Sequence, residues 1–233
     1  GGLTLALASG TLRGLHVSGG GALAGVALRC PRLERTEFVN CPLLEEVEVV
    51  ATPSLTEARF ENCGIGDRAL TALTKACWRL ETLVVSGNVS VGDPVVISAL
   101  TECPRLKTLR ATGCREVGAS SLLLPFLLHP TARGADTAPL SPPPPPRPLQ
   151  LQLLLRLEDL TVSNAPGLTG AHISALAAAL PFLRRLSVSH CRGLVEVAAF
   201  SGRRGDGVTG IGGGGGEGGV REVCDGVGAL VIA

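Results

Sequence analysis

Short apolar alternations recur along the first 200 residues of the chain. Each unit has the form Leu-x-x-Leu-x-Leu, with other small or apolar residues in some of the leucine places, and a small residue or Asn follows three positions later. Alternation with a period of two is typical of a strand that buries one face. The first leucines of the seven units are Leu12, Leu33, Leu55, Leu80, Leu106, Leu157 and Leu183.

The spacing of these units indicates a repeat architecture. Successive first leucines lie 21 to 26 residues apart, except for one step of 51 between Leu106 and Leu157. Steps of about 20 to 29 residues are typical of leucine-rich repeats, whose strands stack in parallel. We therefore predict an α/β leucine-rich-repeat solenoid over residues 1–200, with a curved parallel sheet on its concave face and helices on its convex face.

Amphipathic stretches between the units predict the helices. Residues 66–80, 91–106 and 168–183 carry apolar side chains at helical spacing. Asp67 and Asp93 stand where an N-cap is expected. The side chains predicted to face the core are Leu70, Leu73, Ala76, Cys77, Ile97, Leu100, Cys103, Ile173, Leu176 and Leu180. Two half-units, at 44–49 and 194–199, leave no room for a helix and predict a strand-to-strand connection.

Two segments break the repeat. Residues 131–148 are rich in proline, which cannot continue a helix or donate to a strand ladder, so we predict a disordered insertion there. Within it, Pro142, Pro145 and Arg147 also fit the pattern that polyproline-binding domains recognise. Residues 201–233 are rich in glycine and lack periodic apolar positions, which predicts a disordered tail.

Seven of the eight cysteines fall on two recurring positions of the repeat. Cys30, Cys77 and Cys103 precede a first leucine by three residues. The others end a strand unit, and we expect Cys41, Cys63, Cys114 and Cys191 to form one buried row. Cysteine behaves as a small apolar residue with a weak S–H donor, so reduced core positions explain the spacing better than a disulfide or zinc site. The chain contains no Cys-x-x-Cys pair.

Composition narrows the classes of function. The formal net charge is +1 with scattered charges, so we expect no nucleic-acid or anionic-membrane partner. No paired carboxylates, Ser-His-Asp set or phosphate-binding loop is recognisable, and we expect neither an enzyme nor a bound cofactor or metal. The absence of methionine suggests a fragment of a longer protein.

The segments "CPRLERTEFVNCP", "CWRLETLVVSGN" and "CPRLKTLRATGC" resemble the cysteine-containing repeats of F-box/leucine-rich-repeat proteins. The resemblance covers residues 12 to 199. It implies the substrate-recognition subunit of an SCF-type ubiquitin ligase, acting in proteasomal degradation in the cytoplasm or nucleus. It also implies contact with the SCF adaptor through an F-box outside these 233 residues. The alternative is a non-ligase leucine-rich-repeat scaffold or receptor-type binding protein.

A partner protein is expected to bind the concave sheet. In each unit the residue between the second and third apolar positions points away from the core. These residues carry both signs of charge, which suits a protein epitope better than a phosphate backbone. The predicted protein-binding residues are His16, Glu37, Arg59, Val84, Arg110, Thr161 and Ser187.

Overall fold

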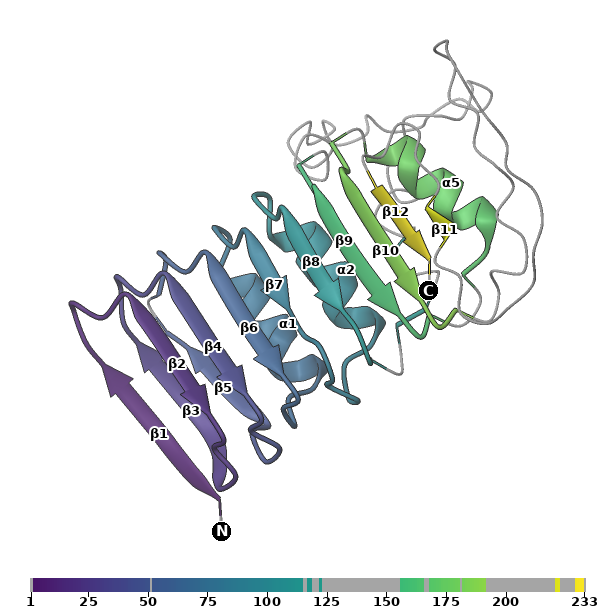
Figure 1. The fold of residues 1–233 in the computed structure, drawn as a ribbon. Helices are drawn as coiled ribbons and strands as arrows, with labels where there is room; N and C mark the ends of the chain where they lie inside the picture. The colour runs from purple at the N-terminus through teal and green to yellow at the C-terminus, as the bar shows by residue number, and fades with distance from the viewer. Residues whose placement is uncertain are drawn as a thin grey trace, which may run out of the picture.

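The computed structural model describes residues 2–50, 52–114, 117–118, 122, 156–165, 168–180, 182–191, 221–222 and 229–232. Over these residues the protein is α/β, and strands of successive units stack side by side into an elongated ladder (Figure 1). The strands form a nine-stranded sheet and a three-stranded sheet, and all pairings but one are parallel.

The large sheet contains one strand from each predicted unit. Each strand pairs in parallel with the strand of the next unit. The long step in the sequence adds no strand between the flanking units, because β8 pairs directly with β9. The seven strands are β2 (Gly14–Ser18), β4 (Arg35–Val39), β6 (Glu57–Glu61), β7 (Thr82–Val84), β8 (Thr108–Ala111), β9 (Asp159–Ser163) and β10 (Arg185–Ser189).

The small sheet consists of β1 (Leu3–Ala8), β3 (Leu23–Arg29) and β5 (Glu46–Val49), paired in parallel in that order. The chain alternates between the two sheets as far as β6, so its first turns run from strand to strand. This confirms the strand predicted in the half-unit at 44–49. The strands β1 and β3 were not predicted, and the half-unit at 194–199 lies outside the described residues.

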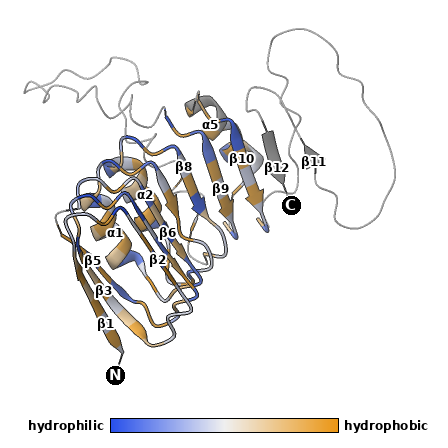
Figure 2. Cartoon of the chain, turned by 60° about the vertical axis from the view of Figure 1, so that its left-hand side comes forward, coloured by the Kyte–Doolittle hydropathy of each residue, from blue (hydrophilic) through white to orange (hydrophobic). Residues whose placement is uncertain are grey.

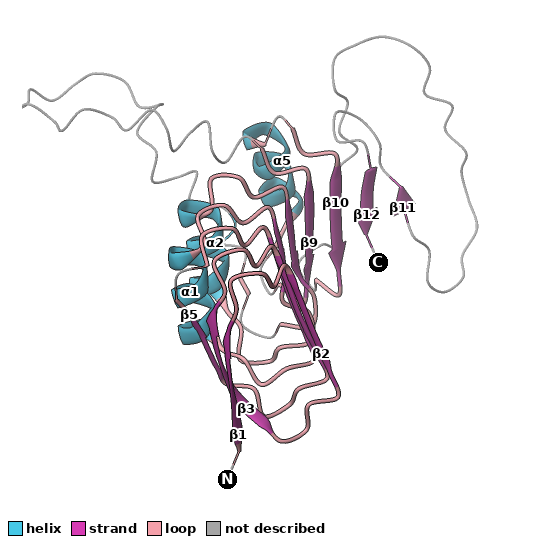
Figure 3. Ribbon diagram, turned by 90° about the vertical axis from the view of Figure 1, so that its left-hand side faces the viewer, coloured by secondary structure: helices cyan, strands magenta, loops and turns pink. Residues whose placement is uncertain are grey.

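After β6, in the third unit, helices take the place of the strands of the small sheet. The helices are α1 (Asp67–Ala76), α2 (Asp93–Glu102) and α5 (Gly170–Ala179). Helix α1 packs against both β5 and α2, and Figure 3 shows the helices together on one side of the large sheet. No helix in the described part of the chain is long and apolar enough to cross a membrane.

The predicted helix caps are wrong. The N-cap residues of α1 and α2 are Gly66 and Gly92, and neither helix has a side-chain cap. Asp67 is instead the first helical residue, and its Oδ1 accepts the backbone N–H of Gly92 at 2.8 Å. Asp93 repeats this arrangement one unit later, where its Oδ1 accepts the N–H of Gly118 at 2.6 Å. These carboxylates therefore join successive units rather than cap their own helices.

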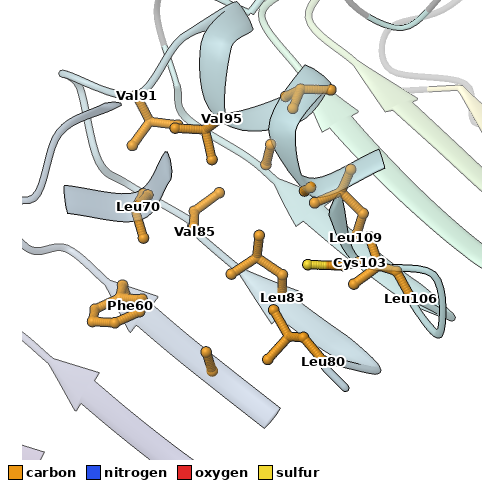
Figure 4. Packing of buried hydrophobic residues seen from close by; sticks show 14 of the residues in the cluster. Phe60, Leu70, Leu80, Leu83, Val85, Val91, Val95, Cys103, Leu106 and Leu109 are labelled. Atoms are coloured by element: carbon orange, nitrogen blue, oxygen red, sulfur yellow. The ribbon is translucent and has the colours of Figure 1, made fainter. Parts of the chain in front are cut away.

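The core lies between the large sheet and the opposite layer. Phe38 and Phe60 stack in it with ring centroids 5.5 Å apart, and Figure 4 shows aliphatic side chains from strands and helices meeting around Leu83. The strands of the large sheet alternate between hydrophobic and hydrophilic positions (Figure 2). Most predicted core side chains are buried, but Ala76 is exposed and Ile97 is only half-buried.

A left-handed residue ends the strand of every unit. Its φ lies between 52° and 73°, a region that suits glycine and tolerates asparagine. The sequence shows this as a recurring Gly or Asn directly before the ninth position, a signal that the sequence analysis did not use. The residues are Gly19, Asn40, Asn62, Gly87, Gly113, Asn164 and His190.

Two of the ninth-position cysteines tie their unit to the one before it. Cys63 Sγ donates to the carbonyl oxygen of Phe38 at 3.5 Å, and Cys114 Sγ donates to that of Val85 at 3.1 Å. In both cases the acceptor is the third apolar residue of the previous unit. Cys41 and Cys191 instead donate to a carbonyl of their own unit, Val39 and Ser189. Cys191 is half-buried in this structure, whereas the other repeat cysteines are buried.

Part of the tail differs from the predicted disorder. Residues Arg221–Glu222 form β11 and Ala229–Ile232 form β12. The strand β12 pairs in parallel with β10, and β11 pairs antiparallel with β12. The sequence "ALVI" suits this position, because branched apolar residues favour strands and pair with the open edge of β10. The rest of the tail and the Pro-rich insertion at 131–148 lie outside the described residues.

Candidate functional site: the outer face of the large sheet

The predicted binding residues form one continuous row across the large sheet. Strand pairing aligns each with its counterpart in the next unit, in the order His16, Glu37, Arg59, Val84, Arg110, Thr161 and Ser187. The two neighbours of Glu37 in its strand, Thr36 and Phe38, are buried on the opposite face. The row therefore lies on the face of the sheet that points away from the core.

A second row, two residues earlier in each strand, shares this face and was missed in the sequence analysis. The strand period of two places it there, so the alternation itself was the available signal. This row supplies the charged partners of the first. Its members are Gly14, Arg35, Glu57, Thr82, Thr108, Asp159 and Arg185.

The two rows form a balanced charge cluster near the N-terminal end of the sheet. Glu57 Oε1 accepts a hydrogen bond from Arg59 Nε at 2.6 Å. Glu57 Oε2 lies 3.5 Å from the Nε of Arg35. The Nδ1 of His16 lies 2.9 Å from Glu37 Oε2. These groups line a shallow hollow of about 410 Å³. With two arginines facing two glutamates, this cluster has no surplus of charge when the histidine is neutral.

A second cluster, on β8 to β10, carries a surplus of positive charge. One oxygen of Asp159 accepts hydrogen bonds from Arg110 at 2.9 Å and Arg185 at 3.2 Å, and its other oxygen accepts the hydroxyl of Thr161 at 3.3 Å. Asp159 is only 8% exposed. Because both arginines remain partly exposed and share one carboxylate, they have donors left for an incoming acid.

A neutral strip separates the two clusters. It consists of Thr82 and Val84 on β7 and Thr108 on β8. Val84 aligns with the binding row but is only 4% exposed, so it offers little contact area to a partner. The face is thus divided into a balanced cluster and a positive cluster.

The thiols of the repeat are poorly suited to nucleophilic chemistry. Burial raises the pKa of Cys63 and Cys114 to about 11, and that of Cys103 to about 12, from an ordinary value of 9.0. The reactive form of cysteine is the thiolate, which these sites disfavour. Among the described residues, no three His, Cys, Asp or Glu side chains converge as a metal site requires.

The chemistry of this face is the main guide to the function of the chain. No protein-family model matches the chain, and no curated protein matches its sequence.

Proposed function

We propose that the chain is a leucine-rich-repeat solenoid that binds a partner protein on the outer face of its large sheet. Support comes from seven strand units in register. In five of them the described chain turns back through a strand or a helix. The observation that carries the proposal is the positive cluster of Arg110 and Arg185 around Asp159. Two partly exposed guanidinium groups held by one buried carboxylate form a rigid pair of donors for an acidic side chain.

We further propose that this binding is substrate recognition for an SCF-type ubiquitin ligase in the cytoplasm or nucleus. The resemblance of the cysteine-containing repeats supports this assignment. A contiguous face crossed by both signs of charge favours a folded protein partner, because complementary charges select orientation and exclude wrong partners. The alternative is a non-ligase scaffold or receptor-type protein that uses the same face.

The test compares two charge-reversal variants of the full-length protein expressed in its own cells. Arg110→Glu with Arg185→Glu reverses the positive cluster, whereas Arg29→Glu with Arg68→Glu makes the same change in charge away from it. Proteins bound to each are quantified by mass spectrometry. We expect a partner that is lost from the first variant and retained by wild type and the second, with equal thermal unfolding of all three.

The ligase assignment has its own readout in the same experiment. SCF adaptor subunits should co-purify with all three proteins, because the adaptor would bind outside this sheet. A partner lost from the first variant without any adaptor in the wild-type sample would favour the scaffold alternative. Identical partner sets for wild type and the cluster variant would contradict the proposed binding face.

A further inference from the structure

The turns that lead into the large sheet form a rim that is distinct from the sheet face. Five of the described turns are closed by a hydrogen bond from the N–H of the first leucine of a unit to the carbonyl three residues earlier. This bond is 3.0 Å long from Leu33 to Cys30 and from Leu80 to Cys77, and 3.1 Å from Leu106 to Cys103. The two residues between donor and acceptor form the tip of the turn. Trp78 and Arg105 are exposed there, and Arg79 is half-buried.

An arginine occupies the second tip position in several turns. Arg79 and Arg105 hold it before β7 and β8, and Arg156 holds the equivalent place before β9. Arg32 occupies the same position in the turn before β4. Because β7, β8 and β9 are neighbours in the sheet, three of these arginines follow one another at the strand spacing of about 4.8 Å.

Trp78 stands in this rim where other turns have proline. The equivalent residues are Pro31, Pro53 and Pro104, and proline is favoured there because its fixed φ suits the turn. Trp78 is instead 50% exposed. The guanidinium carbons of Arg79 and Arg105 lie 5.8 and 5.6 Å from its ring, within cation–π range. The turn thus presents a large aromatic side chain held between two cations.

The charges of the rim arginines are not balanced within the described part of the chain. Ion pairs do form at the position directly after the first leucine of a unit. There Glu34 pairs with Arg13, Glu81 with Lys107 and Glu158 with Arg184. No ion pair of the four rim arginines occurs among the described residues. The Nε of Arg79 is also buried without a hydrogen-bond partner there. The rim therefore has free donors beside the exposed ring of Trp78, and Phe182, which is 58% exposed, occupies the equivalent tip position before β10.

We infer that this rim, formed by Trp78, Arg79, Arg105 and Arg156, binds an extended acidic segment of a partner protein. In an extended peptide, side chains on one side recur every ~6.6 Å, a distance that long arginine side chains can match across neighbouring turns. Carboxylates accept paired hydrogen bonds from guanidinium groups, and Trp78 supplies apolar contact. This surface adds a second contact to the proposed function and uses none of its sheet residues.

A peptide fits the rim better than a single-stranded nucleic acid. Surfaces for single strands offer successive aromatic side chains on which the bases stack. The exposed aromatic side chains of this edge, Trp78 and Phe182, are not successive, because the turns of Arg105 and Arg156 lie between them. The neighbouring charges are balanced, because Glu81 pairs with Lys107 and Glu158 with Arg184, so they add no continuous positive strip for a phosphate backbone.

Trp78 is the sole tryptophan of the chain, so its fluorescence reports directly on the rim. The protein is titrated with a glutamate-rich peptide, with a lysine-rich peptide of equal length as the negative control. We expect a saturable change in Trp78 emission with the acidic peptide that weakens as salt is raised, and none with the basic peptide. No saturable change with the acidic peptide would overturn the inference.

Two variants locate the binding. Arg105→Glu with Arg156→Glu should weaken the acidic peptide about tenfold or more, since two attractive contacts become repulsive. Arg68→Glu, near the start of α1 and at the other end of that helix from Trp78, should leave affinity unchanged. If the double variant unfolds, Arg105→Gln with Arg156→Gln replaces it. Unchanged affinity in the folded rim variant, or tighter binding of an oligothymidylate of equal charge, would contradict an acidic-peptide site.

Discussion

The side-chain amide of Asn88 joins two neighbouring units by donating to the backbone carbonyl oxygen of Phe60 at 2.7 Å. Its Oδ1 accepts the backbone N–H of Cys63 at 2.9 Å. Asn88 is fully buried. One side chain therefore satisfies two backbone groups of the preceding turn, and buried backbone groups left without partners are costly.

Replacement of Asn88 by alanine should lower the free energy of unfolding by about 2 to 4 kcal/mol, because a donor and an acceptor both lose their partner. Asn88→Cys is the matched control, since cysteine holds this position in neighbouring units. It should recover part of the loss, because a thiol can donate to Phe60 but accepts only weakly from Cys63. Urea unfolding measures both. Equal stability of wild type and the alanine variant would contradict this role.

Gly87→Ala should destabilise the protein by about 1 to 3 kcal/mol. Gly87 has a φ of +73°, and an added Cβ would overlap Asn62 Oδ1. Gly14→Ala serves as the control, because a Cβ at that strand position meets nothing within 4 Å. Its effect should stay within about 0.5 kcal/mol. Thermal unfolding compares the two, and similar midpoints would argue against strain at the left-handed position.

Asp67→Ala should lower stability by about 1 to 2 kcal/mol by removing the acceptor for the N–H of Gly92. Asp67→Asn keeps an oxygen in the same place and should retain most of the stability. If Asp67 acted instead through its negative charge at the start of α1, the asparagine variant would lose as much as the alanine variant. Chemical denaturation at low and high salt separates these two explanations.

Stability should fall as the pH rises from about 9 to about 11. Burial raises the pKa of Cys77 and Cys114 to about 11, and that of Cys103 to about 12, in the folded protein. The unfolded chain releases these protons near pH 9, so between the two values the folded state binds more protons and loses stability as pH increases. Below pH 9 these thiols should have no effect.

Urea midpoints at pH 8, 9.5 and 10.5 measure this dependence. Cys103→Ala removes one of the titrating thiols and should make the decline shallower. A wild-type midpoint that is flat over this range would show that the thiols are accessible to solvent. Rapid modification of the same thiols by a small alkylating reagent in the folded protein would lead to the same conclusion.

The sequence by itself determined which residues share a row on the large sheet. Leu15, Val17 and their counterparts alternate with a period of two, and this local rule sets the facing of His16, Glu37 and Arg59 without knowledge of any distant contact. The buried cysteines followed from the same periodicity. The unused signal was equally local, because Gly or Asn recurs where the chain needs a positive φ.

Only the tertiary structure decided how those rows function together. Arg110 and Asp159 lie 49 positions apart in the sequence, and they become neighbours only when β8 pairs with β9 across the long insertion. The acceptor role of Asp67 likewise requires Gly92 of the next unit to lie beside it. Periodicity specifies which side of a strand a residue faces, whereas ion pairs and inter-unit hydrogen bonds depend on which strands stack as neighbours.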